Sequence, residues 1–565
     1  MKKIIFLAAI LLFHLTLPGC YGDLADVMQS KDNLLKKTLV LLALPPSGSS
    51  SSSSSGGPID PPPPSGPSIS QYGITWTFDK EYEYGQFANG DYWVIGPVRI
   101  VKITPESKAI LGTTTISGFT PGSGPNASIR IMNGSVINPA PGNVQAYDNE
   151  MYRWVPSASS TRLYGANYNS SLNVALDVSS SNPLTLPAGT SLISTISYKA
   201  GNRPQLKTAA VLTVLNAPAP AGSFRPPYCG TDKSIKFNKS RIHYTILSSL
   251  SLTGVTSELY SAANGQALVA KLKRVWIDYF NEFGGGTQYT SPLDNMPWYG
   301  REYEAFTGEA SLLLNASSPD LTRIFNITKE DLAIGLIQIG IDNYGVLTNG
   351  GFWVCNGGLN IGRKWPILLA GVLLDDNSMK NIASFNFTPV QYTIYGKITT
   401  PFAEEQTVFY VGQRQYDATH VAYWGDASHT PYVGPTDSGN AIAYATTDFG
   451  LPEWGYMNNP YPIRNNKWWG ASYRPENGCG NAGNILAALI LESTASTKTL
   501  WGNNAMFDYM DRYMSIESKN SFNRQTSNFN ENMWDKYRAQ YGSCYSGLSS
   551  GERQYGSCTA VGVVK

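Results

Sequence analysis

The sequence predicts a multidomain α+β protein, in which an N-terminal β-sandwich is followed by an α/α toroid-like helical domain. The chain has 565 residues, which is more than one domain usually holds. After a low-complexity start, apolar residues first recur with the period of a strand and later with the period of a helix. The predicted parts are a signal peptide at 1–20, a tether at 21–70, a β-sandwich domain at 71–220, a helical domain at 230–520 and a C-terminal tail at 521–565.

The amino-acid composition argues against nucleic acid as a binding partner and in favour of sugars. The 42 Lys and Arg residues balance 41 Asp and Glu, so the net charge is +1, and the chain lacks the excess of cations typical of nucleic-acid binding. Only 15% of residues are charged, against about 25% in ordinary globular proteins. The chain contains 34 Tyr and 13 Trp but only 4 His. A surface built from Asn, Ser, Thr and Tyr suits an extracellular protein that meets sugars.

The first residues predict export. A basic start is followed by an apolar stretch at 4–17, which is shorter than the roughly 20 residues that a membrane-spanning helix needs. The sequence Leu17-Pro18-Gly19-Cys20 then resembles a bacterial lipobox. This resemblance implies a lipid on Cys20 that holds the protein in the bacterial cell envelope, at the outer membrane or cell surface. An ordinary cleaved signal peptide is the alternative.

The segment that follows is a spacer, and the first folded unit comes after it. Residues 46–70 are rich in Ser, Gly and Pro, which predicts an extended tether. Alternating runs at 74–78, 129–131, 172–176 and 192–198, separated by Gly, Asn and Pro, then predict short strands. We expect a sandwich or jelly-roll whose many rings are either core or a platform for sugars.

The second folded unit is predicted to be helical. Helical spacing appears at 268–283, 303–314, 331–344, 366–374, 484–491 and 505–514. Gly284 to Gly286 is expected to end the first of these helices, and Gly345 to cap the third. Helices joined by long, ring-rich loops favour an antiparallel toroid, with a solenoid or an irregular bundle as alternatives.

Four loops combine polar and aromatic residues on this scaffold, and such loops often carry function. The candidate catalytic residues are Tyr299, Arg301, Glu302, Asn356, Arg363, His420 and Glu453. The candidate substrate-binding residues are Trp298, Trp353, Trp454, Trp468, Tyr473 and Arg474. The structural alternatives are a surface ion pair for Arg301 and Glu302, a tight turn around Arg363, a structural hydrogen bond for His420, and a carboxylate buried against backbone for Glu453.

The sequence predicts neither a cofactor nor a metal site. It contains no HExxH, CxxC or EF-hand pattern. Of the 6 Cys residues, Cys544 and Cys558 are the best candidates for a disulfide, because they lie close together near the C-terminus.

In organisation, the lipidated leader, the ring-rich strands and the helical array resemble multidomain polysaccharide lyases and α/α-toroid glycoside hydrolases of bacterial surfaces. The resemblance implies a polysaccharide or another glycan as substrate, and rests on no diagnostic motif. For β-elimination, Arg301 or Arg363 with Asn356 would neutralise a uronate carboxylate, while Tyr299 and His420 would move protons. For hydrolysis, the carboxyl groups are Glu302, Asp417 and Glu453. The alternative is a glycan-binding or adhesin lipoprotein without catalysis.

Overall fold

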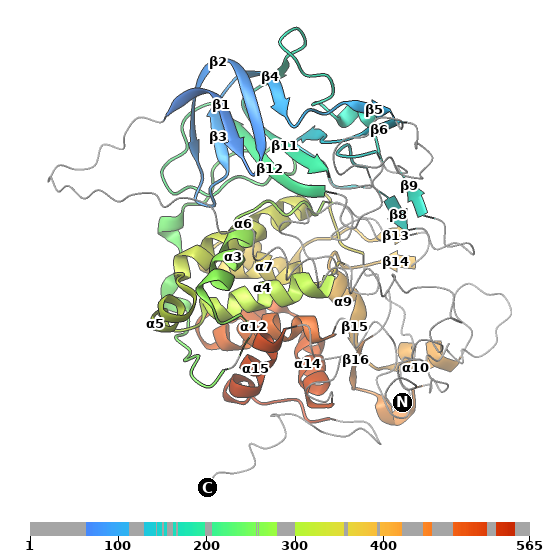
Figure 1. Cartoon of the computed structure of the whole chain (residues 1–565). Helices are drawn as coiled ribbons and strands as arrows, with labels where there is room; N and C mark the ends of the chain where they lie inside the picture. The colour runs from blue at the N-terminus through green and yellow to red at the C-terminus, as the bar shows by residue number, and fades with distance from the viewer. Residues whose placement is uncertain are drawn as a thin grey trace, which may run out of the picture. The chain divides into compact units, whose positions relative to one another are not determined.

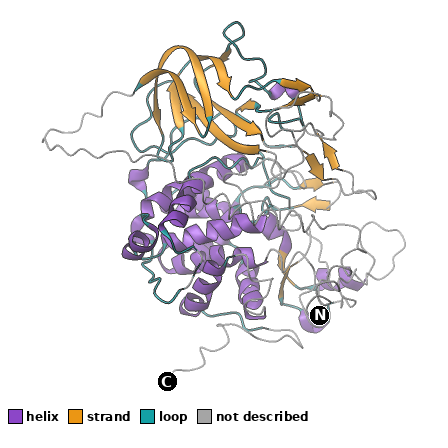
Figure 2. Cartoon of the chain, viewed as in Figure 1, coloured by secondary structure: helices purple, strands orange, loops and turns teal. Residues whose placement is uncertain are grey.

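The computed structural model describes residues 64–111, 129–142, 144–149, 152–154, 162–164, 168–197, 206–255, 257, 259–279, 300–354, 360–392, 396–420, 444–454, 478–516 and 527–547. In these residues a region of strands precedes a region of helices, as the orange and purple segments of Figure 2 show. The protein is therefore α+β, as the sequence predicts. The predicted signal peptide, Cys20 and most of the tether lie outside the described residues.

The strand region is built on a mixed sheet of eight strands, in which β10, β4, β2, β3, β12, β11 and β7 are neighbours in that order and β1 pairs with β2. Only the pairing of β12 with β3 is parallel in this sheet. The strands of this sheet are β1 (Ser65–Gln71), β2 (Ile74–Gln86), β3 (Tyr92–Ile95), β4 (Val98–Thr104), β7 (Ser135–Ile137), β10 (Leu184–Leu186), β11 (Thr190–Ser197) and β12 (Leu206–Leu215). Short pairs are β5 (Ala109–Leu111) with β6 (Ile129–Ile131), and β8 (Tyr152–Trp154) with β9 (Arg162–Tyr164).

The long strand β2 gives the sheet its curl. Its first half pairs with β4, and its second half pairs with β3. Along the first half, residues are alternately buried and part-exposed, as expected for a strand with one face on a core. The indole N–H of Trp76 donates to Ser194 Oγ on β11 at 2.9 Å. The two halves of the sheet therefore enclose one core, to which Ile100 and Leu212 also belong.

The helical region follows. Its helices are α3 (Ala262–Leu272), α4 (Gly300–Leu314), α5 (Ser318–Asp320), α6 (Lys329–Thr348), α7 (Lys364–Leu374), α8 (Asn377–Lys380), α9 (Ala403–Thr407), α10 (Gln413–His420), α12 (Ala482–Ala495), α13 (Thr497–Trp501), α14 (Asn504–Ile516) and α15 (Asn528–Tyr537). The short strands β13 (Val390–Tyr392) and β14 (Gly396–Ile398) pair with each other, as do β15 (Val408–Tyr410) and β16 (Pro452–Trp454). Figure 1 shows α12 beside α15, and these helices pack together.

Glycines let the central helices approach closely. A Cβ on Gly308 of α4 would lie 2.8 Å from the Cα of Gly483 on α12, and a Cβ on Gly340 of α6 would lie 2.3 Å from the carbonyl oxygen of Pro366 on α7. Larger residues would push these helix pairs apart. Close crossings of this kind hold the starts of α4 and α7 in fixed positions.

The helix boundaries differ from the expected ones in two places. The helix expected at 268–283 ends at Leu272, and Val275 to Tyr279 form a buried segment without helical structure. Gly345 does not cap the third helix, because α6 continues to Thr348 and Gly345 packs against Pro227. The reason is that both segments are held by tertiary packing rather than by local propensity.

Other predicted segments also have a definite structure. Within the expected tail 521–565, α15 buries Phe529 and Trp534 in the main core, so the helical region extends beyond residue 520. Tyr416 to His420, expected in a loop, lie in α10. Cys544 is disulfide-bonded, while the buried Cys229 is a free cysteine. The predicted partner Cys558 lies outside the described residues.

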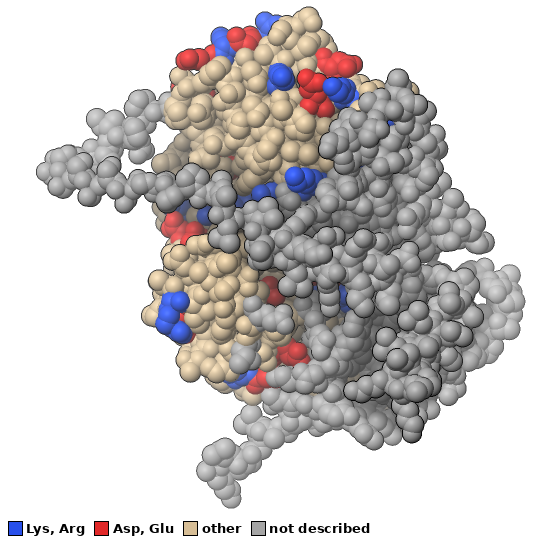
Figure 3. All heavy atoms as spheres, viewed as in Figure 1, with Lys and Arg blue, Asp and Glu red and all other residues tan. Residues whose placement is uncertain are grey.

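The described surface carries little charge. Within the coloured part of the face drawn in Figure 3, tan surface predominates and blue and red side chains are scattered. This agrees with the 15% of charged residues in the sequence. Among the described helices, none is both long enough and apolar enough to cross a bilayer.

Candidate functional site

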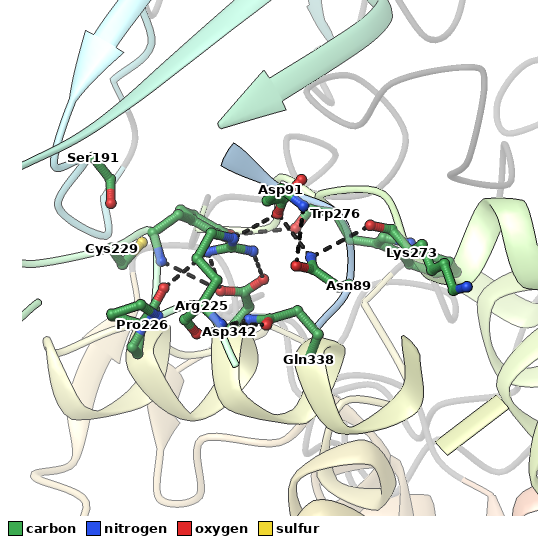
Figure 4. Close-up of polar contacts among 12 residues, drawn as sticks. Asn89, Asp91, Ser191, Arg225, Pro226, Cys229, Lys273, Trp276, Gln338 and Asp342 are labelled. Carbon is green, nitrogen blue, oxygen red and sulfur yellow. Dashed lines mark hydrogen bonds and ion pairs between the residues drawn. The ribbon is translucent and has the colours of Figure 1, made fainter. Parts of the chain in front are cut away.

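Among the buried charges of the described residues, the groups around Arg225 and Arg363 differ in how well their polar atoms are partnered. The first surrounds Arg225, drawn in Figure 4. Its guanidinium bonds Asp91, in the turn between β2 and β3, at 2.6 Å, and Asp342 on α6 at 2.5 Å. The third nitrogen also has acceptors, and Gln338 of α6 bonds the Arg225 backbone. Such complete pairing is typical of a structural junction.

The second cluster lies where α4, α7 and a short turn before α12, η8 (Gly478–Asn481), begin. We call Asp278, Glu304, Arg363 and Glu404 the acid–arginine cluster. All four side chains are buried. Asp278 comes from the non-helical segment after α3, Glu304 from the first turns of α4, and Glu404 from α9. Four distant stretches of sequence therefore meet at one end of the helical array.

Arg363 is the only cation of the cluster, and it is already paired. Its Nε donates to Asp278 Oδ2 at 2.5 Å. The guanidinium also lies over the ring of Tyr303, 3.9 Å from the centroid. The Tyr303 hydroxyl accepts from the amide of Asn343 at 3.0 Å. Burial raises the pKa of Asp278, and the Arg363 charge opposes this rise.

Glu404 caps the start of α7. Its carboxylate accepts from the backbone N–H of Gly362 at 3.1 Å and from that of Lys364 at 3.0 Å. These N–H groups lie at the positive end of the helix dipole, which stabilises an anion. Burial raises the pKa of Glu404, and the two N–H donors act against this rise.

Unlike Glu404, Glu304 accepts no hydrogen bond from backbone N–H groups of the described residues. Two glycines enclose its carboxyl group: a Cβ on Gly362 would lie 2.4 Å from Glu304 Cγ, and one on Gly480 would lie 2.8 Å from Oε2. Neither oxygen has a hydrogen bond of normal geometry to any described residue. Burial, followed by the charge of Glu404, raises the pKa of Glu304 well above its ordinary value, while Arg363 and Asn481 oppose the shift. The surroundings of Glu304 therefore favour its protonated form.

Unpartnered polar atoms concentrate around this acid. Besides both oxygens of Glu304, the atoms Asp278 Oδ1, Asn360 Oδ1, Arg363 Nη2 and Asn481 Nδ2 are buried without a hydrogen bond to the described residues. Buried polar groups are almost always paired in folded proteins. A concentration of unpaired donors and acceptors beside a perturbed acid is typical of a site that binds a polar ligand.

Several residues selected from the sequence lie around this cluster. Arg301 and Glu302, in the first turn of α4, are part-buried and form an ion pair at 3.4 Å. Arg363 belongs to the cluster itself. Trp353 is fully buried, stacks on Phe402 and donates from its indole N–H to the backbone oxygen of Asp278 at 3.2 Å. Trp353 therefore positions Asp278 and offers no exposed ring for a sugar.

Glu453 and Trp454 lie further from the acid, on β16. Glu453 is buried 3.5 Å from the guanidinium of Arg512. Trp454 is also buried, and its ring lies against Tyr509, with 5.6 Å between centroids. The Tyr509 hydroxyl in turn reaches Gly478 at the start of η8. This chain of contacts links β16 with the turn that encloses Glu304.

The remaining candidates are not part of the described arrangement. The residues Trp298, Tyr299, Asn356, Trp468, Tyr473, Arg474 and Cys20 lie outside the described residues, and only the backbone of His420 is described, at the end of α10. Asp417 lies on α10 with an exposed side chain. Among the described residues, no group of three or more His, Cys, Asp or Glu side chains is arranged to hold a metal ion.

Glu304, Glu404 and Asp278 were not predicted from the sequence. For Glu304 a signal exists, because small or short polar residues follow it at helical spacing: Thr307, Gly308, Ser311 and Asn315. Such a stripe marks a tightly packed face, on which an acid is out of place. Asp278 and Glu404 have no comparable local signal.

Comparison of the chain with protein-family models, with curated proteins and with solved structures finds no match. The geometry of the acid–arginine cluster therefore carries the functional argument.

Proposed function

We propose that the helical region is the catalytic part of a glycan hydrolase, with Glu304 as its general acid. The observation that carries this proposal is a fully buried carboxyl group that packs closely against two glycines, has a pKa raised by burial, and lies next to a second carboxyl group. Hydrolysis of a glycosidic bond needs an acid that keeps its proton near neutral pH and gives it to the leaving oxygen.

Glu404 is the second carboxyl group of the proposed pair. Its two backbone N–H donors favour the anion, whereas Glu304 has no such donors. Burial raises the pKa of both carboxyl groups, and Glu404 differs in having two backbone N–H donors that oppose the rise. Acid and base roles follow from such differences in surroundings. In this proposal Glu404 activates water or stabilises positive charge on the sugar.

Elimination on a uronate is less well supported by the described residues. Arg363 already pairs with Asp278, so its charge is not free to neutralise a substrate carboxylate. Burial raises the pKa of Tyr303, which lies against Arg363, so the phenolate that would act as the base is harder to form. Both features favour hydrolysis over β-elimination.

The proposal includes the wider architecture and the location. We infer that the helices close into an α/α toroid and that the curled sheet is a sandwich. The close crossings of α4 with α12 and of α6 with α7, and the core shared by both halves of the sheet, support this. The lipobox-like sequence at Cys20 supports a lipid-anchored protein of the bacterial cell envelope.

The test compares Glu304→Gln with the unaltered protein on neutral and uronate polysaccharides, measuring released reducing ends. We expect hydrolysis of a neutral polysaccharide and a loss of about 10²- to 10⁴-fold in Glu304→Gln. Thermal unfolding should change little, because glutamine is isosteric with a protonated glutamate. Glu309→Gln is the matched control, since Glu309 lies on the same helix and accepts from Ser527 instead.

Full activity in Glu304→Gln would contradict the assignment of the acid. Ultraviolet-absorbing unsaturated products from a uronate polymer would instead establish elimination. If no polysaccharide is cleaved but some are bound, the protein is the glycan-binding lipoprotein that the sequence leaves as the alternative.

A further inference from the structure

We infer that Tyr228 is a positioning residue of the acid–arginine cluster, which fixes the backbone of Asp278 and connects it with the junction around Arg225. Tyr228 is buried in the hydrophobic core that the strand and helical regions share. As an account of how the fold controls the proposed acid Glu304, the inference rests on the proposed function.

The two ends of Tyr228 have partners in different clusters. Its backbone N–H donates to Asp342 Oδ1 at 3.3 Å, and Asp342 pairs with Arg225. Its side-chain hydroxyl accepts from the backbone N–H of Asp278 at 2.9 Å and donates to the backbone oxygen of Trp276 at 3.3 Å. A tyrosine hydroxyl both donates and accepts, so the two bonds are compatible. Tyr228 therefore joins the junction to the cluster.

These bonds replace those that a helix would supply to Asp278. The residue lies in the buried segment 275–279, which is not helical, so its N–H and C=O need partners from elsewhere in the chain. The N–H donates to Tyr228, and the C=O accepts from the indole N–H of Trp353 at 3.2 Å. Two side chains from distant stretches of sequence therefore fix the backbone from which the Asp278 carboxylate extends.

The position of Asp278 in turn sets that of Arg363. The Arg363 Nε donates to Asp278 Oδ2 at 2.5 Å. The face of the guanidinium lies on Tyr303, whose hydroxyl accepts from Asn343 of α6. Asn343 follows Asp342, which binds the backbone of Tyr228, directly in sequence. Both contacts that hold Arg363 are therefore connected to the same turn of α6.

The held position of Arg363 matters for the charge around Glu304. The neighbouring charged residues form three ion pairs, Arg301 with Glu302, Arg363 with Asp278, and Lys364 with Glu405. Besides burial, which raises it most, the charge of Glu404 raises the pKa of Glu304 and that of Arg363 lowers it. The carboxylate of Asp278 balances the charge of Arg363 and so limits this lowering. The fixed pair therefore helps the proposed acid to keep its proton.

The experiment titrates Glu304 in the full chain by infrared spectroscopy. The band of its protonated carboxyl group is identified by its absence from Glu304→Gln, so that no substrate is needed. We expect Asp278→Asn to raise the acid dissociation constant of Glu304 about tenfold, because Arg363 then lacks its anion. Tyr228→Phe removes only the hydroxyl that holds Asp278, and should raise the constant in the same direction by a smaller factor, of about 3.

Tyr260→Phe is the matched control. The Tyr260 hydroxyl is also buried, but it has no hydrogen bond to the described residues, and its ring packs against the same core. Its titration should equal that of the unaltered protein. Trp353→Phe removes the other bond to the Asp278 backbone and should act in the same direction as Tyr228→Phe. It tests the inference independently if circular dichroism shows that Tyr228→Phe does not fold.

A titration of Tyr228→Phe that equals that of Tyr260→Phe overturns the inference, even if thermal stability falls, because the role of the hydroxyl is then structural only. An unchanged titration in Asp278→Asn, or a shift in the opposite direction, overturns the electrostatic link to Glu304. Failure of the proposed function has a different readout, because no polysaccharide would then be cleaved while the titrations still differed.

Discussion

At the scale of single residues, α4 carries two acids that burial affects in the same direction but that have different partners. Glu304 packs against Gly362 and Gly480, and Asn481 opposes the rise of its pKa. Glu309, further along the helix, accepts from the hydroxyl of Ser527, the N-cap of α15. In the proposed function the first arrangement supplies a proton to a glycan, whereas the second joins two helices.

Glu309 predicts a pH dependence of stability. Burial raises its pKa from 4.5 to about 7, with Ser527 and Lys271 opposing the rise. The folded protein therefore binds more protons than the unfolded chain between about pH 4.5 and 7, and Glu309 makes folding less favourable as pH increases through this window. We expect Glu309→Gln to reduce the fall in unfolding free energy across it, as measured by urea denaturation at several pH values. An identical pH profile in the two proteins would contradict this.

Residue types and local spacing identified part of the site. Arg363 was selected from the sequence as an anion-binding group, and it does lie in the cluster, but its anion is Asp278 of the same chain. Asp278 and Glu404 reach the cluster through the folding of distant segments, and neither is marked by its neighbours in sequence. Residue spacing in the sequence therefore could not predict that Arg363 pairs with Asp278.

At the scale of elements, the turn before α7 depends on Gly362. Its φ is +89°, and a Cβ there would also overlap Glu304. Gly350, after α6, has a φ of +91° but open space around it. Alanine at either position strains the backbone, but only at Gly362 does it also overlap Glu304. Comparing the two substitutions therefore distinguishes the two costs.

We expect Gly350→Ala to lower the unfolding free energy by about 1 kcal/mol through backbone strain alone. Gly362→Ala should cost about 1–3 kcal/mol more, because Glu304 must move as well. Chemical denaturation measures both values. Equal losses would show that the contact between Gly362 and Glu304 contributes nothing to stability.

Helices with long apolar runs were the most predictable elements. The expected helices at 303–314, 366–374, 484–491 and 505–514 correspond to α4, α7, α12 and α14, each extended by a few residues. The segment after Leu272 was not predictable, because Trp276, Ile277 and Tyr279 continue a helix-like spacing although the segment is not helical. Its N–H groups bond outside it instead, as when Asp278 donates to the Tyr228 hydroxyl at 2.9 Å.

At the scale of the whole molecule, the strand and helical regions share one hydrophobic core. Val136 and Ile193 from the strands belong to the same cluster as Leu272 and Leu314 from the helices. Arg225 adds a buried ionic connection between the turn after β2 and α6. The sequence predicted two separate domains, and it contained no signal for this common core.

We expect Arg225→Met to destabilise the protein by about 3–5 kcal/mol, because Asp91 and Asp342 would remain buried without their cation. The triple variant Arg225→Met, Asp91→Asn, Asp342→Asn should recover part of this loss. Thermal unfolding, followed through near- and far-ultraviolet circular dichroism, measures both effects. A loss below 1 kcal/mol in the single variant would show that the ionic connection is dispensable.

Cys229 follows Arg225 in this junction and is a buried, free thiol. Burial, strengthened by the charge of Asp342, raises its pKa well above the ordinary value, which disfavours the thiolate. Thiolates are the species that alkylating reagents attack, and Cys229 is thus inert as long as strands and helices stay together. The rate at which Cys229 is alkylated therefore reports how often the strand and helical regions separate.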